Sequence, residues 1–535
     1  MTIKNYLAIF LFLFLQITSL CNSLTLSTSS RYIVNHATGK RVKLACVNWA
    51  SHLEPMIAEG LEKKPLKYIA IQITKSGFNC VRFTWATYMF TRPDYYNLKV
   101  SQSLDKYGLE SAKAGIARNN PQLLNMNVVE VHNAVVTELG RNKLMVVLDN
   151  HVSQPKWCCS GRDGNGFFGD ASFNPNEWLQ GLTQVARTYK GNPAVVGMSM
   201  RNELRGDHQN EADWYKYMQD GATRIHRENP DFLVIISGLH YDTILGFLKT
   251  KPLQINLNNK LVFEAHWYSY GFPADKWTSQ TNHLCASVTQ NARDNYLFLL
   301  TGNNSFPLFL SEFGIDQRGA NEADNRYISC LLATMAENDV DWALWTFHGS
   351  YILREEKVNL EEFYGVIDFN WDRPRNPSFL GRLQLVRQIN QDPKSNQPIY
   401  YVMFHPLSGQ CVQIGKTNIV LADCKTVTRW DQHQDGGPIK LMGKPQCLGV
   451  SRDGAPARVS NDCSNNGSKW KFASSSGLHL AAQDGEGKYL CLEKNASDGK
   501  LVTKKCLCVG DNLVDFPSCA QNPQVQWFKL VPANV

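Results

Sequence analysis

Eight short apolar runs between residues 42 and 347 constrain the fold of this chain more than any other feature. Each is rich in β-branched or aromatic residues, and most are flanked by amphipathic stretches with helical periodicity. The runs are 42–47 (VKLACV), 79–84 (NCVRFT), 144–149 (LMVVLD), 194–199 (AVVGMS), 233–237 (LVIIS), 261–265 (LVFEA), 307–311 (PLFLS) and 342–347 (WALWTF). Continuous apolar strands that alternate with helices indicate a parallel sheet covered by helices. Eight of them predict an α/β fold, the (β/α)₈ or TIM barrel.

The alternative is an open, doubly wound sheet, which needs a glycine-rich first turn of the G-x-G-x-x-G kind. No such turn follows the first runs. Polar or large side chains come instead at the ends of successive runs, namely Asn48, Trp85, His151, Glu203, His266 and Glu312. In a barrel these positions converge on one mouth, where catalytic sites are built. The pattern therefore predicts a functional site at the carboxyl ends of the strands.

The length of 535 residues exceeds what one hydrophobic core usually holds, so we expect more than one domain. Residues 1–23 contain a lysine, an apolar stretch and then small residues, which predicts a secretory signal peptide. The apolar stretch is too short to span a bilayer and no second candidate follows, so we expect a secreted, extracellular protein without a membrane anchor after cleavage. We assign 24–390 to the barrel and the polar, proline-containing stretch 391–398 to a linker.

Fourteen of the fifteen cysteines follow the predicted signal, and an oxidising compartment would allow them to pair. The barrel region holds Cys46, Cys80, Cys158, Cys159, Cys285 and Cys330, and six cysteines allow fifteen pairings. A zinc site would need CxxC pairs or closely spaced Cys and His, and we expect no metal. Three sequons, at Asn303, Asn466 and Asn495, agree with a secreted glycoprotein. The net charge of +7 comes without a dense Lys/Arg block, so we expect no nucleic-acid partner.

Residues 399–535 are rich in glycine and cysteine, and they contain a threefold repeat. The repeats are Cys411…Cys424…Trp430, Cys447…Cys463…Trp470 and Cys491…Cys506…Trp527. A repeat of this kind predicts three small units that share one core. We expect one disulfide within each repeat, and a fourth between Cys508 and Cys519 in an insertion of the third repeat.

The repeated region resembles the ricin-type β-trefoil, a lectin module with one Cys pair and one Gln-x-Trp in each repeat. Here the three sites read Thr428-Arg-Trp430, Ser468-Lys-Trp470 and Val525-Gln-Trp527. Gln413, Gly449 and Glu493 stand where the family has its sugar-binding Asp. The resemblance implies an all-β trefoil over 399–535 whose partner would be a carbohydrate, although the usual binding residues have changed.

Two glutamates follow strands about half the predicted ring apart, Glu203 after the fourth and Glu312 after the seventh. Glycoside hydrolysis needs such a pair, one protonated acid for the leaving oxygen and one ionised carboxylate for the anomeric carbon. A single Glu after a strand is more often a salt-bridge or helix-start residue. The surrounding residues favour the catalytic interpretation, because further chemistry-bearing side chains fall at the same end of successive strands: Arg82, His151, Asn202, His266, Tyr268 and Trp345.

This series resembles glycoside hydrolase family 5, whose members share Arg, His, Asn-Glu, His-x-Tyr, Glu and Trp in this order. The likeness spans residues 31–385, and stretches such as CVNWASHLEPM and MSMRNELRG are most similar to the plant branch described as cellulase-like or β-glucosidase. Leu204 departs from the family's common cellulases, which have Pro after the Asn-Glu. The resemblance implies a retaining β-glycosidase with Glu203 as acid/base, Glu312 as nucleophile, a carbohydrate or glycoside substrate and no cofactor.

Physical chemistry suggests how the two carboxyls would differ. We expect Arg82 and the Tyr268 hydroxyl to lower the pKa of Glu312, and burial and repulsion to raise the pKa of Glu203. We expect Asn202 to bind the sugar 2-hydroxyl. In the same site, His151 and His266 would orient the substrate and the acid, and Trp345 would offer an apolar face to the sugar ring. Arg201 and Arg205 are expected to form salt bridges.

The shape of the mouth decides the specificity. The connection 88–142, together with 157–159 and 164–170, would enclose a pocket if it rose above the barrel, and a pocket favours β-glucosidase-like action on small glycosides or oligosaccharides. An open cleft would favour an endo-β-1,4-glucanase or a mannanase acting on cell-wall polysaccharide. Transglycosylation is a further alternative, as is a non-catalytic carbohydrate-binding protein with an inactive barrel.

Overall fold

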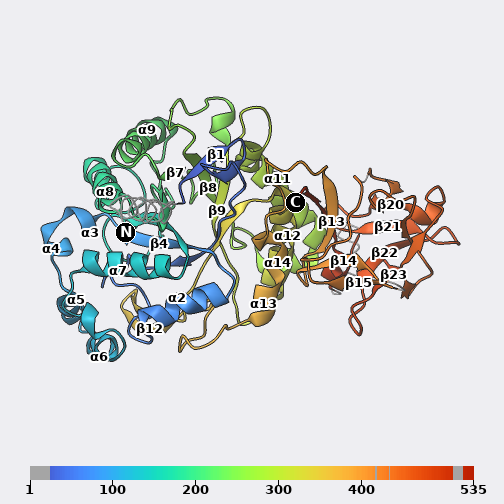
Figure 1. Cartoon of the computed structure of the whole chain (residues 1–535). Coiled ribbons are helices and arrows are strands. Elements are labelled where there is room, and N and C mark those ends of the chain that lie inside the picture. The colour runs from blue at the N-terminus through green and yellow to red at the C-terminus, as the bar shows by residue number, and fades with distance from the viewer. Residues whose placement is uncertain (1–23, 416–417, 433, 510–521) are drawn as a thin grey trace, which may run out of the picture.

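The structure is a computed structural model that describes residues 24–415, 418–432, 434–509 and 522–535. Eight parallel strands close into a barrel in the order β10-β3-β4-β5-β6-β7-β8-β9 (Figure 1). They are β3 (Ala45–Trp49), β4 (Cys80–Ala86), β5 (Met145–Val152), β6 (Val195–Ser199), β7 (Leu233–Ile236), β8 (Leu261–His266), β9 (Leu308–Phe313) and β10 (Asp341–Leu344). Each overlaps one of the eight predicted runs, so the predicted barrel is confirmed. The predicted signal peptide, 1–23, lies outside the described residues.

Helices cover the outside of the barrel, and capping residues in the sequence mark where they begin. The longer ones are α2 (Leu66–Lys75), α6 (Glu110–Asn119), α7 (Val128–Arg141), α8 (Pro175–Thr188), α9 (Glu211–Glu228), α11 (Thr281–Asn295) and α12 (Glu322–Asn338). In α8, the Asn174 side chain accepts hydrogen bonds from the backbone of Asn176 and Glu177, and Pro175 takes the first helical position. Along α8, the side chains of Trp178 and Leu182 are buried against the barrel.

Short elements fill the connections. They are α3 (Tyr88–Thr91), α4 (Pro93–Tyr96), α5 (Val100–Lys106), η1 (Pro121–Leu123), η2 (Gly246–Lys249), α10 (Ala274–Ser279), η3 (Leu297–Leu300), α13 (Pro377–Arg382) and α14 (Gln384–Arg387). The long connection 88–142 therefore folds into a group of helices beside the barrel (Figure 1).

Two hairpins close the barrel ends. The first joins β1 (Leu26–Ser29) to β2 (Tyr32–Asn35), and its Leu26 and Ile33 pack with Cys46, Cys80 and Val147 in one apolar cluster at the amino ends of the strands. The second joins β11 (Ser350–Arg354) to β12 (Lys357–Glu361) directly after β10. Because the carboxyl ends of the strands carry the mouth, this second hairpin lies beside the site.

The C-terminal region is built from antiparallel strands, as its sequence predicts. One sheet pairs β13 (Tyr400–His405), β14 (Gln410–Ile414), β15 (Ile419–Ala422) and β24 (Lys529–Ala533). Two further sheets contain β16 (Gly437–Pro438), β17 (Cys447–Gly449), β18 (Ala455–Pro456), β19 (Arg458–Ser460), β20 (Lys469–Phe472), β21 (Leu480–Gln483), β22 (Tyr489–Lys494) and β23 (Leu501–Lys505). Two short 3₁₀ turns, η4 (Asn466–Ser468) and η6 (Pro523–Gln526), precede β20 and β24. The trefoil arrangement itself stays a prediction.

Disulfides connect neighbouring elements in both regions. The three predicted within the repeats are present, Cys411–Cys424, Cys447–Cys463 and Cys491–Cys506. In the barrel, Cys46 pairs with Cys80, Cys158 with Cys159, and Cys285 with Cys330. The predicted bond between Cys508 and Cys519 involves a residue outside the described ones.

The C-terminal region packs firmly against the barrel, and Figure 1 shows α12, α13 and α14 between the two. Tyr400, Val402 and Trp527 belong to the same apolar cluster as the outer layer of the barrel. The predicted linker 391–398 has no helix or strand, yet it is not a loose tether: the Asp392 backbone donates to Asn534, and Gln391 accepts from Tyr32. None of the described helices combines the length and apolar character needed to cross a membrane.

Candidate active site

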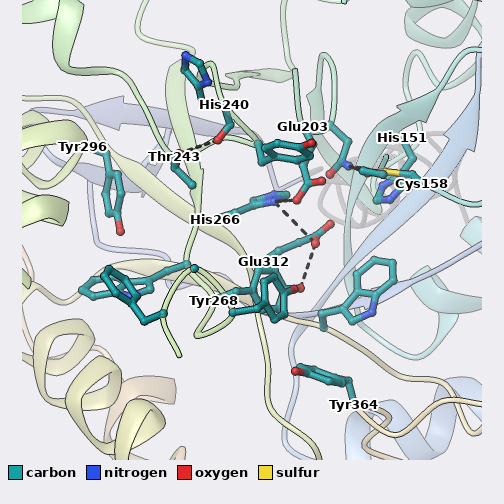
Figure 2. Close-up of a pocket in the computed structure, with 18 of the residues that line it drawn as sticks. His151, Cys158, Glu203, His240, Thr243, His266, Tyr268, Tyr296, Glu312 and Tyr364 are labelled. Atoms are coloured by element: carbon teal, nitrogen blue, oxygen red, sulfur yellow. Dashed lines mark hydrogen bonds and ion pairs between the residues drawn. A yellow bond between two sulfur atoms is a disulfide. The ribbon is translucent and has the colours of Figure 1, made fainter. Parts of the chain in front are cut away.

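A pocket of about 850 Å³ opens at the carboxyl ends of the strands (Figure 2). Seven of the eight predicted site residues line it: His151, Asn202, Glu203, His266, Tyr268, Glu312 and Trp345. The eighth, Arg82, lies fully buried beneath it and contacts Glu312 and Asn202. The structure thus brings together residues from six strands and the segments that follow them.

Arg82 on β4 is the centre of the buried network below the pocket. One guanidinium nitrogen donates to Glu312 Oε1 at 2.8 Å and to Asn48 Oδ1 at 3.0 Å. The other donates to Asn202 Oδ1 at 3.0 Å and lies 2.9 Å from Asp149 Oδ1. The acidic neighbours of Arg82 raise its pKa despite its burial. Arg82 therefore stays charged and fixes two side chains of the pocket floor.

Glu203 and Glu312 face one another with His266 between them (Figure 2). The His266 Nδ1 lies 2.9 Å from Glu203 Oε1 and 3.8 Å from Glu312 Oε2. One carboxylate oxygen from each glutamate and the imidazole nitrogen all lie within 4.8 Å of one another. The Tyr268 hydroxyl donates to Glu312 Oε2 at 3.1 Å. The two carboxyl groups are thus close enough to act on the two atoms of a single substrate bond.

Burial dominates the acidity of both groups. Removal from water raises the pKa of Glu203 to about 7 and the pKa of Glu312 to about 7. The expected direction for Glu203 is confirmed. The expected low pKa of Glu312 is wrong: Arg82 and His266 do act to lower it, but burial and the negative charge of Glu203 outweigh them.

The backbone at Glu203 explains why charged residues follow the fourth strand so closely. Glu203 has a left-handed φ of 42°, which is rare for a residue with a side chain. Its N–H donates to Asp242 Oδ2 at 3.1 Å, and its carbonyl accepts from Arg205 at 2.7 Å. Arg205 also pairs with Asp163, as a salt-bridge former should, so these contacts together hold an unfavourable conformation.

Arg201 differs from its expected role. Its guanidinium donates to Asn150 and Ser153, both at 3.1 Å, and lies 3.8 Å from the centre of the Phe173 ring. Among the described residues no acidic side chain lies within salt-bridge distance of Arg201, so the predicted salt bridge is replaced by hydrogen bonds and a cation–π contact.

His151 and Trp345 form a stacked wall of the pocket. Their rings lie 5.7 Å apart with an angle of 21°, and the other face of His151 contacts His52 at 4.1 Å. The His151 Nδ1 is 2.6 Å from Asp149, which orients the imidazole. Trp345 comes directly after β10, whereas the sequence places it inside the eighth strand.

The side-chain amide of Asn202 has a partner at both its oxygen and its nitrogen. Because arginine can only donate, the Asn202 oxygen faces Arg82, and its Nδ2 must face the sulfur atoms of Cys158 and Cys159, each at 3.6 Å. This disulfide therefore forms part of the pocket wall beside Asn202.

Several sequence expectations about the mouth are corrected by the structure. Trp85 points away from the mouth and packs its ring edge-on against Phe90 at 5.4 Å, since alternate residues of a strand face opposite sides. Residues 88–142 and 164–170 do not line the pocket; of the three predicted wall segments only 157–159 does. Asp242 was missed by sequence reasoning, because it lies in a turn after β7 without any motif.

Two clusters among the described residues have donor atoms close enough for a metal ion: His151 with Cys158 and Cys159, and Glu203 with His266 and Glu312. The first does not fit a thiolate site, because its two sulfur atoms are bonded to each other. The second fits a hard cation by its donors, yet the same three groups are joined by the hydrogen bond and ion pairs of an acid/base pair.

The closed barrel with paired carboxylates at its mouth defines a glycoside hydrolase. Residues 37–350 match the family described as Cellulase (glycosyl hydrolase family 5). The chain belongs to glycosyl hydrolase family 5.

Relatives and solved structures agree with this membership. A "Glycosyl hydrolase 5 family protein" of Chamaecyparis obtusa is 44% identical over 537 residues, covering 98% of this chain and 95% of that protein. An "Endoglucanase" of Paenibacillus polymyxa is 20% identical over 345 residues, covering 60% and 79%. An endocellulase from Pyrococcus horikoshii has a TM-score of 0.53 at 17% identity, covering 68% of this chain and 99% of that one. The catalytic domain of the major endoglucanase from Xanthomonas campestris pv. campestris has a TM-score of 0.53 at 21% identity, covering 68% and 98%. The two structural likenesses show the shared barrel fold.

Proposed function

We propose that this glycoside hydrolase is a secreted, retaining β-glycosidase that releases a terminal sugar, most simply a β-glucosyl unit, from small glycosides or oligosaccharides. The observation that carries the proposal is the approach of the two carboxyl groups, whose oxygens come within 4.8 Å. Retaining enzymes separate their carboxyl groups by about 5 Å, whereas inverting enzymes leave about 6.5–9.5 Å for a water molecule.

The contacts support a different role for each carboxyl. Glu312 receives a hydrogen bond from Arg82 and another from Tyr268, and both stabilise its charged form. Glu203 has no cation of that kind within 3 Å in the described residues and faces His266 instead. When the pair holds one proton, we therefore place it on Glu203 and the negative charge on Glu312.

The first step forms a covalent sugar–enzyme intermediate. A Glu312 oxygen attacks the anomeric carbon while the bond from that carbon to the glycosidic oxygen breaks. The glycosidic oxygen takes the Glu203 proton and leaves as an alcohol. In the second step a water oxygen attacks the anomeric carbon, Glu203 accepts the water proton, and the bond to Glu312 breaks. Two displacements restore the original β configuration.

Neighbouring residues would orient the sugar in this reaction. Asn202 is fixed so that its amide N–H groups border the pocket, where one of them would bind the 2-hydroxyl. The stacked Trp345 and His151 rings would support the sugar ring. His266 contacts both carboxyls, so it would stabilise the proton on Glu203 and the charge on Glu312 in turn.

One end of the pocket supports the release of terminal sugars. Beyond Trp345, the Trp157 ring packs edge-on against Tyr351 at 5.4 Å, and the Arg354 guanidinium lies 3.5 Å from the Trp157 ring centre. Arg354 is in turn 3.3 Å from Glu362. Trp157 and Arg354 line the pocket beside Trp345, so the cage would block a longer sugar chain on that side and favours a pocket over a through-going cleft.

A second candidate is endo-acting β-1,4-glucanase activity. It is favoured by the names of the relatives from Paenibacillus polymyxa and Xanthomonas campestris, which are described as endoglucanases. The sequence of the chain supports secretion through the predicted signal peptide. For the C-terminal region, carbohydrate binding stays a proposal, because Glu493, at the position of the lectin family's Asp, already bonds Gln526 at 2.8 Å.

The test compares the full chain with Glu312→Ala on nitrophenyl β-glucoside, cellobiose and a soluble β-glucan. The proposal expects release of nitrophenol and of glucose by the wild type only. Equal release by both proteins would defeat the assignment of Glu312. Rapid shortening of the glucan, with little action on the small glycosides, would favour the endo-acting candidate. Product analysis with an added alcohol distinguishes transfer of the sugar to that alcohol from hydrolysis.

A further inference from the structure

Three solvent-exposed aromatic side chains line the pocket: Tyr241, Tyr270 and Phe272, here called the aromatic rim. Their exposed fractions are 38%, 67% and 38%. They make up half of the six Tyr and Phe side chains that are exposed among the described residues. Large apolar groups are left in water at one place mainly where a ligand will cover them.

Tyr241 is placed by an unusual turn. His240, Tyr241 and Asp242 have φ values of 52°, 60° and 59°, three consecutive left-handed residues that all carry side chains. Such residues normally occur singly, because each costs about 1–2 kcal/mol. The turn is anchored where the Tyr241 N–H donates to the Leu204 carbonyl at 2.9 Å. The chain thus maintains a strained turn directly beside Glu203, and that turn presents Tyr241 at the mouth.

The second part of the rim continues from the other carboxyl. The Tyr270 ring stacks on the Tyr268 ring at 4.6 Å with an angle of 19°. Tyr268 is the residue that donates to Glu312. Phe272 follows in the same loop, where its N–H donates to the Ser269 carbonyl at 3.1 Å. Tyr270 is therefore connected to Glu312 through Tyr268, and Tyr241 precedes Asp242, which accepts a hydrogen bond from Glu203.

The position of the rim identifies the part of the substrate that it would meet. Glu203 gives its proton to the glycosidic oxygen, so the leaving group must extend past Glu203. The Trp157, Tyr351 and Arg354 cage lies instead beside Trp345, where the Trp157 and Trp345 ring centres are 6.3 Å apart. The rim consequently borders the space of the leaving group, not of the sugar that is attacked.

Besides the exposed His240 imidazole and the hydroxyls of the rim tyrosines, few polar groups border the rim, and the nearest side-chain acceptors are already engaged. The Thr243 hydroxyl donates to the His240 carbonyl at 2.6 Å. Asn291 accepts from Asn295 through both its side-chain and its backbone oxygen. Two further neighbours, Val288 and Tyr296, are buried and add their side chains to the pocket wall. A second sugar would bring several hydroxyls that need partners, whereas a flat apolar ring needs only surface to stack on.

We propose that the aromatic rim is a binding subsite for a flat, apolar ring on the leaving group, so that the preferred substrates are aryl or benzyl-type glycosides and not chains of sugars. This inference rests on the proposed β-glycosidase function, because Glu203 as the acid defines the leaving-group side.

The experiment measures binding apart from catalysis. Benzyl and methyl glycosides of glucose, mannose, galactose and xylose are titrated by calorimetry into the full-length Glu312→Ala protein, with Glu203→Gln as a second inactive variant. We expect the benzyl glycoside of the preferred sugar to bind about tenfold more tightly than its methyl partner. The same titrations with Tyr270→Ala/Phe272→Ala added should reduce that preference to about twofold or less. Tyr489→Ala, which removes another exposed tyrosine side chain in the C-terminal region, should leave it unchanged.

The outcomes separate the subsite from the reaction. Tight, rim-dependent binding without hydrolysis by the wild type would support the subsite and overturn the proposed function. Hydrolysis without a benzyl preference, or tighter binding of cellobiose than of benzyl β-glucoside, would overturn the subsite alone. If no glycoside binds, naphthol is titrated by itself: binding that the rim variant loses supports the subsite, and no binding to the unsubstituted rim overturns it.

Discussion

Replacement of Glu203 by Gln should change the pH dependence of the reaction in a defined way. The structure raises the pKa of Glu203 to about 7 through burial. Above that pH the wild-type acid loses its proton, so kcat/KM for an alkyl β-glucoside should approach a tenfold fall per pH unit, which amounts to about 50-fold between pH 7 and pH 9. Glu203→Gln cannot donate as an acid. Its rate should be lower by about 10²–10⁴-fold and flat across the same range.

The assay is the pH profile of kcat/KM for methyl or benzyl β-glucoside and for a nitrophenyl β-glucoside. An activated leaving group needs little protonation, so the loss in Glu203→Gln should be much smaller for the nitrophenyl substrate. Glu486→Gln, a substitution of an exposed carboxylate paired with Lys488, is the matched control and should keep the wild-type profile. A wild type that remains fully active at pH 9, or a Glu203→Gln profile that still falls from pH 7, would show that Glu203 is not the acid.

Two further predictions concern Glu312 and the Cys158–Cys159 disulfide. The folded-state pKa of Glu312 is raised from its ordinary 4.5 to about 7. The free energy of unfolding should therefore decrease as pH rises through that interval, by about 3 kcal/mol at 1.36 kcal/mol per pKa unit. Glu312→Gln should therefore melt at a higher temperature than the wild type at pH 8 but not at pH 4, and equal differences at both pH values would contradict this. Replacement of Cys158 and Cys159 by Ala removes the contact that holds the Asn202 amide, so kcat/KM should fall about tenfold and the penalty for a 2-deoxy substrate should shrink. The pair Cys285→Ala/Cys330→Ala removes a disulfide between α11 and α12 and should change stability without changing that penalty.

The barrel could be predicted from the sequence because the pattern that defines each of its strands is local and recurs along the chain. Each strand is a continuous apolar run, which is the pattern of a strand buried on both faces, and eight such runs define the ring. The carboxyl ends of these strands must then meet, so Glu203, Glu312 and their neighbours could be placed together without knowledge of any contact. The threefold spacing of Cys and Trp predicted the disulfides within the repeats in the same way.

The remaining features depend on three-dimensional contacts that no local pattern records. Asp242 acts through a turn of left-handed residues, and nothing in the letters LHYD distinguishes this turn from an ordinary loop. The net acidity of Glu312 depends on how far burial exceeds the effect of Arg82, and a sequence names the partners without giving the burial. Residues 88–142 look like a lid by length alone, yet their apolar positions pack them as helices against the side of the barrel.

The close packing of the C-terminal region against the barrel could not be predicted from the sequence either. A polar stretch with two prolines reads as a linker, but its neighbours decide whether it moves. Here Asp392 bonds Asn534 and Lys529 pairs with Glu337 at 2.7 Å across the junction. Asn282 at the start of α11 bonds both Cys508 and Ser476 of the C-terminal region. Since α11 also supplies Val288 and Asn291 to the pocket, the C-terminal region supports the site as well as adjoining it.

The role of Glu312 as the nucleophile is tested most directly by trapping the sugar on the enzyme. An activated fluorosugar glycoside forms the first intermediate and slows its breakdown, and peptide mass spectrometry then locates the attached sugar. We expect one sugar per chain, bonded to Glu312 in the peptide that spans 308–313, and none on Glu203. A sugar attached to any other side chain, or product released at once with inverted configuration, would contradict it.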